Sequence, residues 1–132
     1  MNDIQPIHAP GAPKAIGPYS AAIRAGDFLY CSGQTPLDPK TGELIQGDVG
    51  AQTRRVLQNL RTVLNAAGAD WPNVVKSSVF LIDMGDFAAM NDAYGEVLSP
   101  TRPARTTVAV RELPRGARVE IDMVAYLPDA NR

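Results

Sequence analysis

The chain has one cysteine and one histidine, and these scarcities exclude disulfide-stabilised folds and zinc sites. A single Cys31 cannot form an internal disulfide, and no pair of cysteines or histidines has the spacing of a zinc site. We therefore predict no metal site and no cofactor, and we interpret Cys31 as a small buried side chain of a strand. The lone His8 is predicted to be a surface or strand residue and not a ligand.

Basic residues are too few and too dispersed to form a surface for nucleic acid. Thirteen Lys and Arg residues against 14 Asp and Glu residues give a formal charge of −1, and no basic run exceeds Arg54-Arg55. The N-terminal residues lack the pattern of a signal peptide, and no apolar run approaches membrane-spanning length. The sequence therefore predicts a cytoplasmic protein that binds neither nucleic acid nor a membrane.

Apolar residues make up 45% of the 132 residues, which predicts one core and a single domain over residues 1–132. Helical spacing over residues 49–67 predicts an amphipathic helix with Asp48 as its N-cap and Gly68 just past its end. A second helix is predicted from Phe87 to Leu98, before Pro100. Strands are predicted at residues 5–8, 20–24, 28–33, 74–82, 101–108 and 113–121. The order βββαβαββ indicates an α+β fold with both helices on one face of a mixed sheet.

The last two strands are predicted to form a hairpin around Pro114 and Gly116. A register that pairs Ala109 with Glu120 gives each strand a polar and an apolar face. One face would carry the polar set Arg105, Thr107, Ala109, Arg118, Glu120 and Asp122, and the other would be core, with Thr106, Val108, Val110, Val119, Ile121, Met123 and Ala125. The polar face is either solvated or covered by a partner subunit. Because both helices lie on the other side, oligomerisation is the predicted cover.

Five separated motifs resemble the Rid (YjgF) family of reactive-intermediate deaminases. They are Ala15-Ile16-Gly17-Pro18-Tyr19-Ser20, Ser32-Gly33-Gln34-Thr35-Pro36-Leu37-Asp38-Pro39, Asp86-Phe87 with Met90-Asn91 and Tyr94, Arg102-Pro103-Ala104-Arg105, and Leu113-Pro114-Arg115-Gly116-Ala117. The resemblance implies a chorismate-mutase-like fold and a homotrimer with a central barrel and three sites between subunits. It also implies hydrolysis of 2-imino acids, such as 2-iminobutanoate and the 2-iminopropanoate formed from 2-aminoacrylate, to 2-keto acids and ammonia.

Arg105 and Glu120 are the predicted catalytic residues. A guanidinium grips a planar carboxylate with two hydrogen bonds, so Arg105 is predicted to hold the carboxylate of the imino acid. Hydrolysis also needs a group that positions water and moves its proton, and Glu120 is the candidate. The structural alternatives are an ion pair that ties Arg105 to a neighbouring Asp or Glu, and a salt bridge from Glu120 to Arg118 or Lys76.

The resemblance implies further substrate-binding residues. Tyr19 would wall the pocket from the adjacent subunit, Ser32 would offer a hydroxyl, and Gly33 would allow close approach of the ligand. Asn91 serves either the pocket or the helix surface, and Tyr19 is alternatively a packing residue. Thr107 stands where many relatives carry cysteine, and we expect it to alter substrate preference more than competence, because imine hydrolysis needs no thiolate.

A second functional class remains open, namely a trimeric module that binds small carboxylates, or acts like a chaperone, without turnover. Such a module would keep Arg105 but would not need Glu120, so the presence of both favours the enzyme. Ribonuclease activity finds no support, because the chain is not basic and lacks a pair of histidines for acid-base cleavage.

Overall fold

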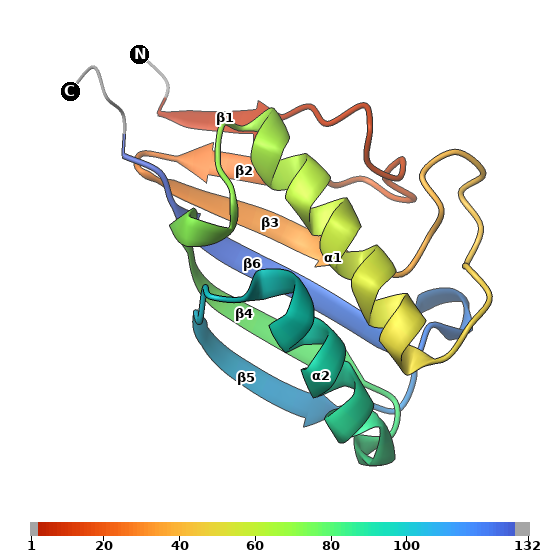
Figure 1. The fold of residues 1–132 in the computed structure, drawn as a ribbon. Coiled ribbons are helices and arrows are strands. Elements are labelled where there is room, and N and C mark those ends of the chain that lie inside the picture. Colours follow the sequence, from red (N-terminus) through yellow and green to blue (C-terminus); the bar gives the residue numbers. More distant parts are fainter. Residues whose placement is uncertain (1–2, 129–132) are drawn as a thin grey trace.

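A six-stranded mixed sheet forms the centre of the molecule (Figure 1). The computed structural model describes residues 3–128. Along the sheet the strands are ordered β1-β2-β3-β6-β4-β5, and only the β4–β5 pair is parallel. Their bounds are β1 (Ile4–Ile7), β2 (Ala22–Ala25), β3 (Phe28–Gln34), β4 (Val74–Leu81), β5 (Ala104–Ala109) and β6 (Val119–Tyr126). The predicted α+β class and the order βββαβαββ are confirmed.

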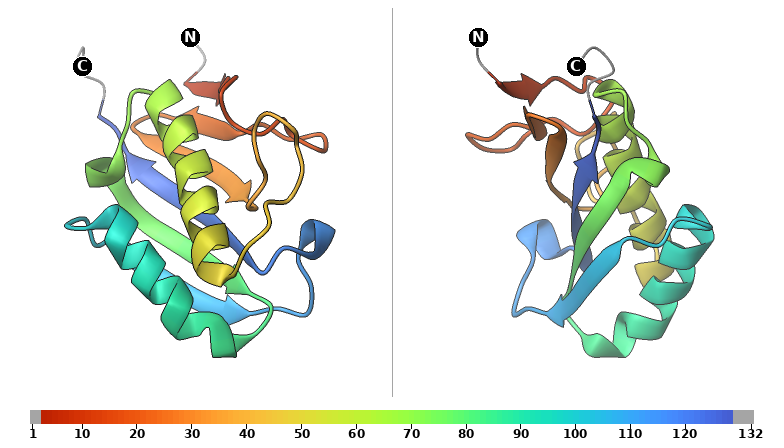
Figure 2. Two further views of the ribbon diagram at one scale, coloured as in Figure 1. Left: turned by 45° about the vertical axis from the view of Figure 1, so that its right-hand side comes forward. Right: turned by 90° about the vertical axis from the view of Figure 1, so that its left-hand side faces the viewer.

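Both long helices lie on the same side of the sheet, as the right-hand view of Figure 2 shows. Helix α1 (Val49–Ala66) begins as predicted, with an Asp48 carboxylate oxygen accepting a hydrogen bond from the Ala51 N–H at 2.9 Å. Gly68, just beyond the helix, has a φ of +87° that favours glycine. Helix α2 (Phe87–Leu98) follows the short 3₁₀ helix η2 (Met84–Asp86). Two further 3₁₀ turns are η1 (Trp71–Asn73) and η3 (Pro114–Gly116).

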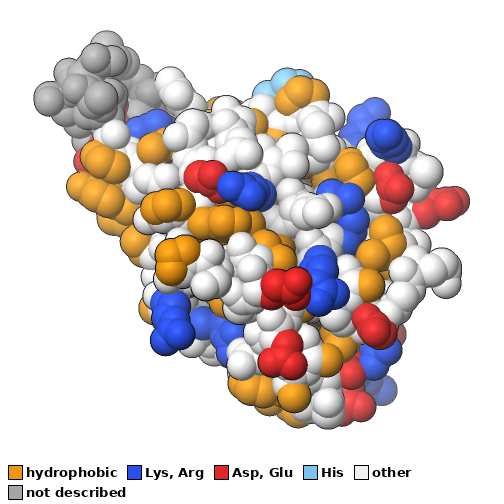
Figure 3. Space-filling model, in the orientation of Figure 1, with side chains coloured by type: hydrophobic (Ala, Val, Ile, Leu, Met, Phe, Trp, Pro, Cys, Tyr) orange, Lys and Arg blue, Asp and Glu red, His pale blue; other side chains and the backbone are white. Residues whose placement is uncertain are grey.

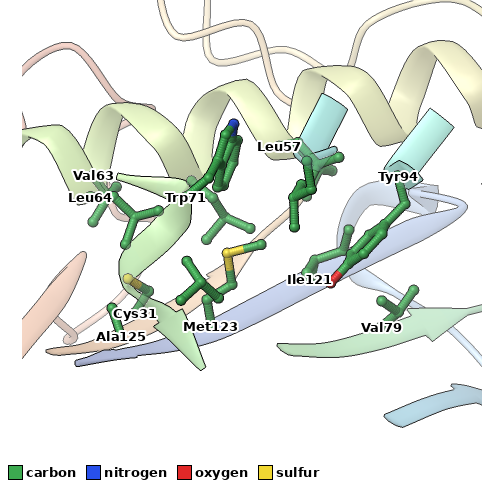
Figure 4. Close-up of a cluster of buried hydrophobic side chains, with 14 of the residues drawn as sticks. Cys31, Leu57, Val63, Leu64, Trp71, Val79, Tyr94, Ile121, Met123 and Ala125 are labelled. Carbon is green, nitrogen blue, oxygen red and sulfur yellow. The ribbon is translucent and has the colours of Figure 1, made fainter. Parts of the chain in front are cut away.

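The hydrophobic core fills the space between the sheet and the two helices (Figure 4). Leu57 and Leu64 of α1 meet Ile121 and Met123 of β6, and all four side chains are buried. Cys31 belongs to this core, as predicted, and burial together with the nearby Asp122 raises the pKa of its thiol to about 12. A thiol in this environment is an unreactive apolar side chain.

The predicted hairpin between the last two strands is wrong, because β4 lies between β5 and β6. Residues 110–118, which include the predicted Pro114–Gly116 turn as η3, connect two strands that are not neighbours. Phe80 of β4 is paired with Val108 on one side and with Glu120 on the other, so these three side chains share a face. Arg105 therefore lies on the helix face and Glu120 on the opposite face.

Because β5 presents the opposite face to the helices from the one predicted, the predicted core is also corrected. Thr106 and Val108 are exposed on the open face, whereas Val119, Ile121, Met123 and Ala125 are buried as expected. The physical reason lies in β4, where Val79 and Leu81 are fully buried against the helices. A strand so rich in β-branched and apolar residues is best covered at an interior position of the sheet, while the more polar β5 can occupy the edge.

The face of the sheet opposite the helices is open and partly apolar. Tyr30 is 50% exposed, Tyr126 44% and Val108 41%. Neither α1 nor α2 covers this face, because both lie on the other side of the sheet (Figure 2). The open face is therefore a surface that can bury apolar area only against another chain, and the predicted trimer stays a prediction. Within residues 3–128, no helix is long and apolar enough to cross a membrane.

Candidate active site

Arg105 on the edge strand β5 points toward α2 and is held by three side chains. Its Nη2 donates a hydrogen bond to the Asn91 Oδ1 at 2.7 Å. Its guanidinium carbon lies 4.8 Å from the ring centroid of Tyr94 and 5.7 Å from that of Phe87. These contacts fix the guanidinium and leave its other N–H groups available for a planar anion.

Tyr94, which packs against Arg105, is held in place by a buried residue of the sheet. Ser77 of β4 is paired with Arg105 in the parallel register and is fully buried. Its hydroxyl is hydrogen bonded to the hydroxyl of Tyr94 at 2.6 Å. Burial raises the pKa of Tyr94, against the opposing effects of Ser77 and Arg105, so the phenol stays neutral near pH 7. The arginine thus rests on a ring whose position is set by the sheet.

A pocket of about 350 Å³ opens beside this arginine, and we call it the clamp pocket. It is lined by Asn91, Tyr94, Gly95, Ser99, Thr101, Arg102, Pro103 and Arg105. No acidic side chain is among these residues. In the described part of the chain Arg105 forms no ion pair, so the alternative in which a neighbouring Asp or Glu ties it down does not hold there.

Thr107 shares the helix-facing side of β5 with Arg105, two residues further along the strand. It is paired with the buried Val79. Its Oγ1 is buried and has no hydrogen-bond partner within residues 3–128. Thr107, a predicted substrate-binding residue, therefore lies next to Arg105 on the same face of β5. Its hydroxyl makes no hydrogen bond with the described residues.

Glu120 lies on the open face of β6, against the backbone of Gly33 in β3. A Cβ atom placed on Gly33 would come within 3.0 Å of the Glu120 carboxyl carbon, so glycine is what allows this packing. Burial, and to a smaller extent the Asp122 carboxylate, raises the pKa of Glu120. A carboxyl group with a raised pKa is better suited to exchange protons near neutral pH.

Neither predicted salt-bridge partner reaches Glu120. The Arg118 Nη2 is paired with the Asp86 Oδ1 at 2.7 Å, and the Lys76 Nζ donates to the Thr106 hydroxyl at 2.7 Å. The purely structural interpretation of Glu120 therefore has no basic partner among the described residues.

Tyr19 and Ser32 lie near Gly33 but not near Arg105. Tyr19 is 49% exposed, and its ring and Gly33 line the same small cavity of about 30 Å³. The Tyr19 hydroxyl accepts a hydrogen bond from the Ile16 N–H at 3.3 Å, which orients the loop before β2. The Ser32 hydroxyl donates to the Ser20 carbonyl at 2.7 Å, so in this structure its proton serves the same loop.

The predicted residues thus form two groups that one chain does not bring together. The clamp group, consisting of Arg105, Asn91, Tyr94 and Thr107, lies at the β5 edge on the helix face. The carboxylate group, consisting of Glu120, Gly33, Ser32 and Tyr19, lies at β6, β3 and the loop before β2. Strand β4 separates Glu120 from Arg105, and the two side chains point to opposite faces.

Sequence reasoning missed the side chains that hold the clamp in place. Tyr94 was noted as a position of the second helix and of one motif but was given no role in the site, and Ser77 was not singled out. The spacing of Asn91 and Tyr94, three residues apart on one helix face, could have indicated that both contact the same partner. The buried hydroxyl of Ser77 carried no such signal, because its partner lies on another element.

Two comparisons of sequence decide the family. Residues 9–127 match the sequence model of the family described as endoribonuclease L-PSP. A RutC family protein of Pyrococcus horikoshii is 50% identical over 120 residues, which are 91% of this chain and 95% of that protein. The chain belongs to the Rid (YjgF) family.

Other members of the Rid family agree in sequence and in fold. Mouse 2-iminobutanoate/2-iminopropanoate deaminase is 46% identical over 114 residues, which are 86% of this chain and 84% of the mouse protein. The crystal structure of RidA from an Antarctic Psychrobacter superposes with a TM-score of 0.89 at 41% identity, covering 93% of this chain and 99% of that one. The resemblance inferred from the five motifs is confirmed.

Proposed function

We propose that the protein hydrolyses 2-imino acids to 2-keto acids and ammonia. The observation that carries this proposal is Arg105, whose guanidinium lies in a pocket and, among the described residues, is hydrogen bonded only to a neutral amide oxygen. A carboxylate next to a C=N bond is a planar anion that such a group holds in a defined orientation. The name of the mouse relative, at 46% identity, supports the same chemistry.

The reaction needs little beyond orientation and one proton carrier. Arg105 would hold the carboxylate of the imino acid, and the oxygen of a water molecule would bond to the imine carbon. Glu120, with its raised pKa, would take a proton from that water and pass a proton to the nitrogen. In the resulting carbinolamine the hydroxyl proton passes to the amino nitrogen, the C–N bond breaks as the C=O bond forms, and ammonia leaves the keto acid. Thr107 does not line the pocket and its hydroxyl is buried, so it would act on the site only through the packing beside Arg105.

We propose that neighbouring subunits complete each site. In one chain the clamp group and the carboxylate group lie on opposite faces of the sheet, with β4 between Arg105 and Glu120. A cyclic homotrimer in which the open sheet faces form a central barrel would place Glu120 and Tyr19 of one subunit beside Arg105 of the next. The exposed aromatic side chains of the open face support this arrangement, since they gain an apolar partner.

A coupled assay tests the proposed activity. An amino-acid oxidase would generate 2-iminopropanoate or 2-iminobutanoate, and keto-acid release would be timed with and without the protein. We expect the protein to accelerate release in proportion to its concentration. Release at the spontaneous rate for both imines would contradict the proposal.

Two measurements on the same protein preparation distinguish the enzyme from a non-catalytic carboxylate-binding module. A module of that kind would bind pyruvate in calorimetry through Arg105 yet leave imine hydrolysis unchanged. Light scattering adds a second criterion, because a monomer of 14.1 kDa would exclude sites shared between subunits. The matched family is described as an endoribonuclease, so incubation with RNA serves as a control. We expect no RNA cleavage.

A further inference from the structure

The clamp pocket contains a second arginine that the proposed reaction does not use. Arg102 lies in the segment that leads into β5, three residues before Arg105, and lines the same pocket of about 350 Å³. It forms no hydrogen bond or ion pair with any residue in the described range. Its charge is therefore not compensated by the chain itself.

Among residues 3–128, no acidic side chain forms an ion pair with either arginine. The pocket lining includes an amide, three hydroxyl groups and two guanidinium groups, and no carboxylate. Glu96, on the same helix α2, is engaged with Arg54 at 2.8 Å. Figure 3 shows Lys and Arg side chains gathered over the start of β5 at the left-hand edge, with Asp and Glu side chains lying further away. Such a pocket favours a ligand that brings two negative charges.

The size and chemistry of the pocket fit a short dicarboxylate. A volume of about 350 Å³ accommodates a molecule of four or five carbon atoms together with some water. One carboxylate would bind Arg105, which is already fixed by Asn91 and Tyr94. The second would meet Arg102, with the Ser99 and Thr101 hydroxyls as further donors.

We propose that the preferred substrates are 2-imino acids that carry a second carboxylate on the side chain, with Arg102 as its recognition residue. This inference rests on the proposed function. For the four-carbon member, 2-iminosuccinate, the oxygen of water bonds to the imine carbon, the C–N bond breaks, and the products are oxaloacetate and ammonia. The class of reaction that must supply such a substrate is the oxidation of an acidic amino acid at its α-carbon.

The first test compares two imines in the coupled assay. D-aspartate oxidase would supply 2-iminosuccinate and D-amino-acid oxidase would supply 2-iminopropanoate. We expect the wild-type kcat/KM to be higher for 2-iminosuccinate. Arg102→Gln should lower the ratio of the two kcat/KM values by about 10-fold or more, because one charge-assisted interaction is lost. Arg111→Gln, which removes one exposed arginine outside the pocket, is the matched control and should leave the ratio unchanged.

A binding measurement separates this inference from the proposed function. Calorimetry would give Kd values for oxaloacetate and pyruvate in the wild type, Arg102→Gln and Arg111→Gln. Tighter binding of oxaloacetate that disappears only in Arg102→Gln supports the dicarboxylate site even if no imine is hydrolysed. Hydrolysis of both imines with a ratio that Arg102→Gln does not move, or equal Kd values in the wild type, would overturn it.

Discussion

Arg105 and Glu120 differ in how fully the chain surrounds them. The clamp group is complete within one chain, since Arg105 is fixed by Asn91, Tyr94 and Phe87, and Tyr94 is anchored by the buried Ser77. The carboxylate group is open, with Tyr19 half exposed and Glu120 lying on an uncovered sheet face. Under the proposed function, Arg105 of one chain would bind the carboxylate, and a second chain would supply Glu120.

The largest effect is expected from Arg105→Lys, which tests the clamp group alone. Lysine keeps the charge but lacks the planar fork, so the imino acid would lose its orientation. We expect kcat/KM to fall by about 10³-fold, the size of two lost charge-assisted hydrogen bonds. The coupled imine assay measures this, with Arg111→Lys as the matched control. Near-native kcat/KM in the folded variant would contradict this role of Arg105 and make Arg102 the candidate for binding the carboxylate of the imino acid.

Glu120→Gln tests the carboxylate group by keeping the volume of the side chain and removing the base. We expect kcat to fall by about 10²-fold, which is typical of a lost general base. Calorimetry on the same variant should still detect pyruvate binding through Arg105. Unchanged turnover would return Glu120 to a structural role.

Gly33→Ala tests whether the packing of Glu120 of β6 against Gly33 of β3 matters for turnover. The added methyl group would press against the Glu120 carboxyl group and displace it. We expect kcat to fall by about 10-fold through this misplacement, with a smaller change in the KM set by Arg105. A kcat equal to that of the wild type would mean that the position of the Glu120 carboxylate is not critical.

The smallest expected effect is a change of pH dependence in Asp122→Asn. The Asp122 carboxylate raises the pKa of Glu120, although burial is the larger cause. As a base Glu120 must be deprotonated, so activity is lost as the pH falls through its raised pKa. Removing the Asp122 charge lowers that pKa, and the acid limb of kcat/KM should move to lower pH. A limb that stays in place or moves upward would show that another group controls it.

The fold was largely predictable because its helices and strands follow local rules. The helical spacing, the Asp48 cap and Gly68 identified α1 within one or two residues. The position of β5 was not predictable in this way. Its short polar run is compatible with a hairpin partner or with an edge position beside β4, and only the burial of Val79 and Leu81 in the whole sheet decides between them.

The structure brings some of the predicted site residues together, although their roles stay predictions, and it corrects the arrangement that the sequence predicted. Arg105 and Asn91 meet in the structure, and Glu120 meets Gly33. The relation between the two groups depends on which face each strand presents, and the wrong register placed Arg105 and Glu120 on one face. Once β4 is inserted between β5 and β6, a neighbouring subunit becomes necessary for the proposed reaction.

Complementation between two inactive variants tests that requirement most directly. Arg105→Lys and Glu120→Gln subunits would be mixed in equal amounts, exchanged by partial unfolding and refolding, and verified as mixed assemblies by native mass spectrometry. If each site takes Arg105 from one subunit and Glu120 from the next, random cyclic assemblies contain about one intact site in four, so about a quarter of wild-type activity should return. Mixed assemblies that remain inactive would contradict the shared site.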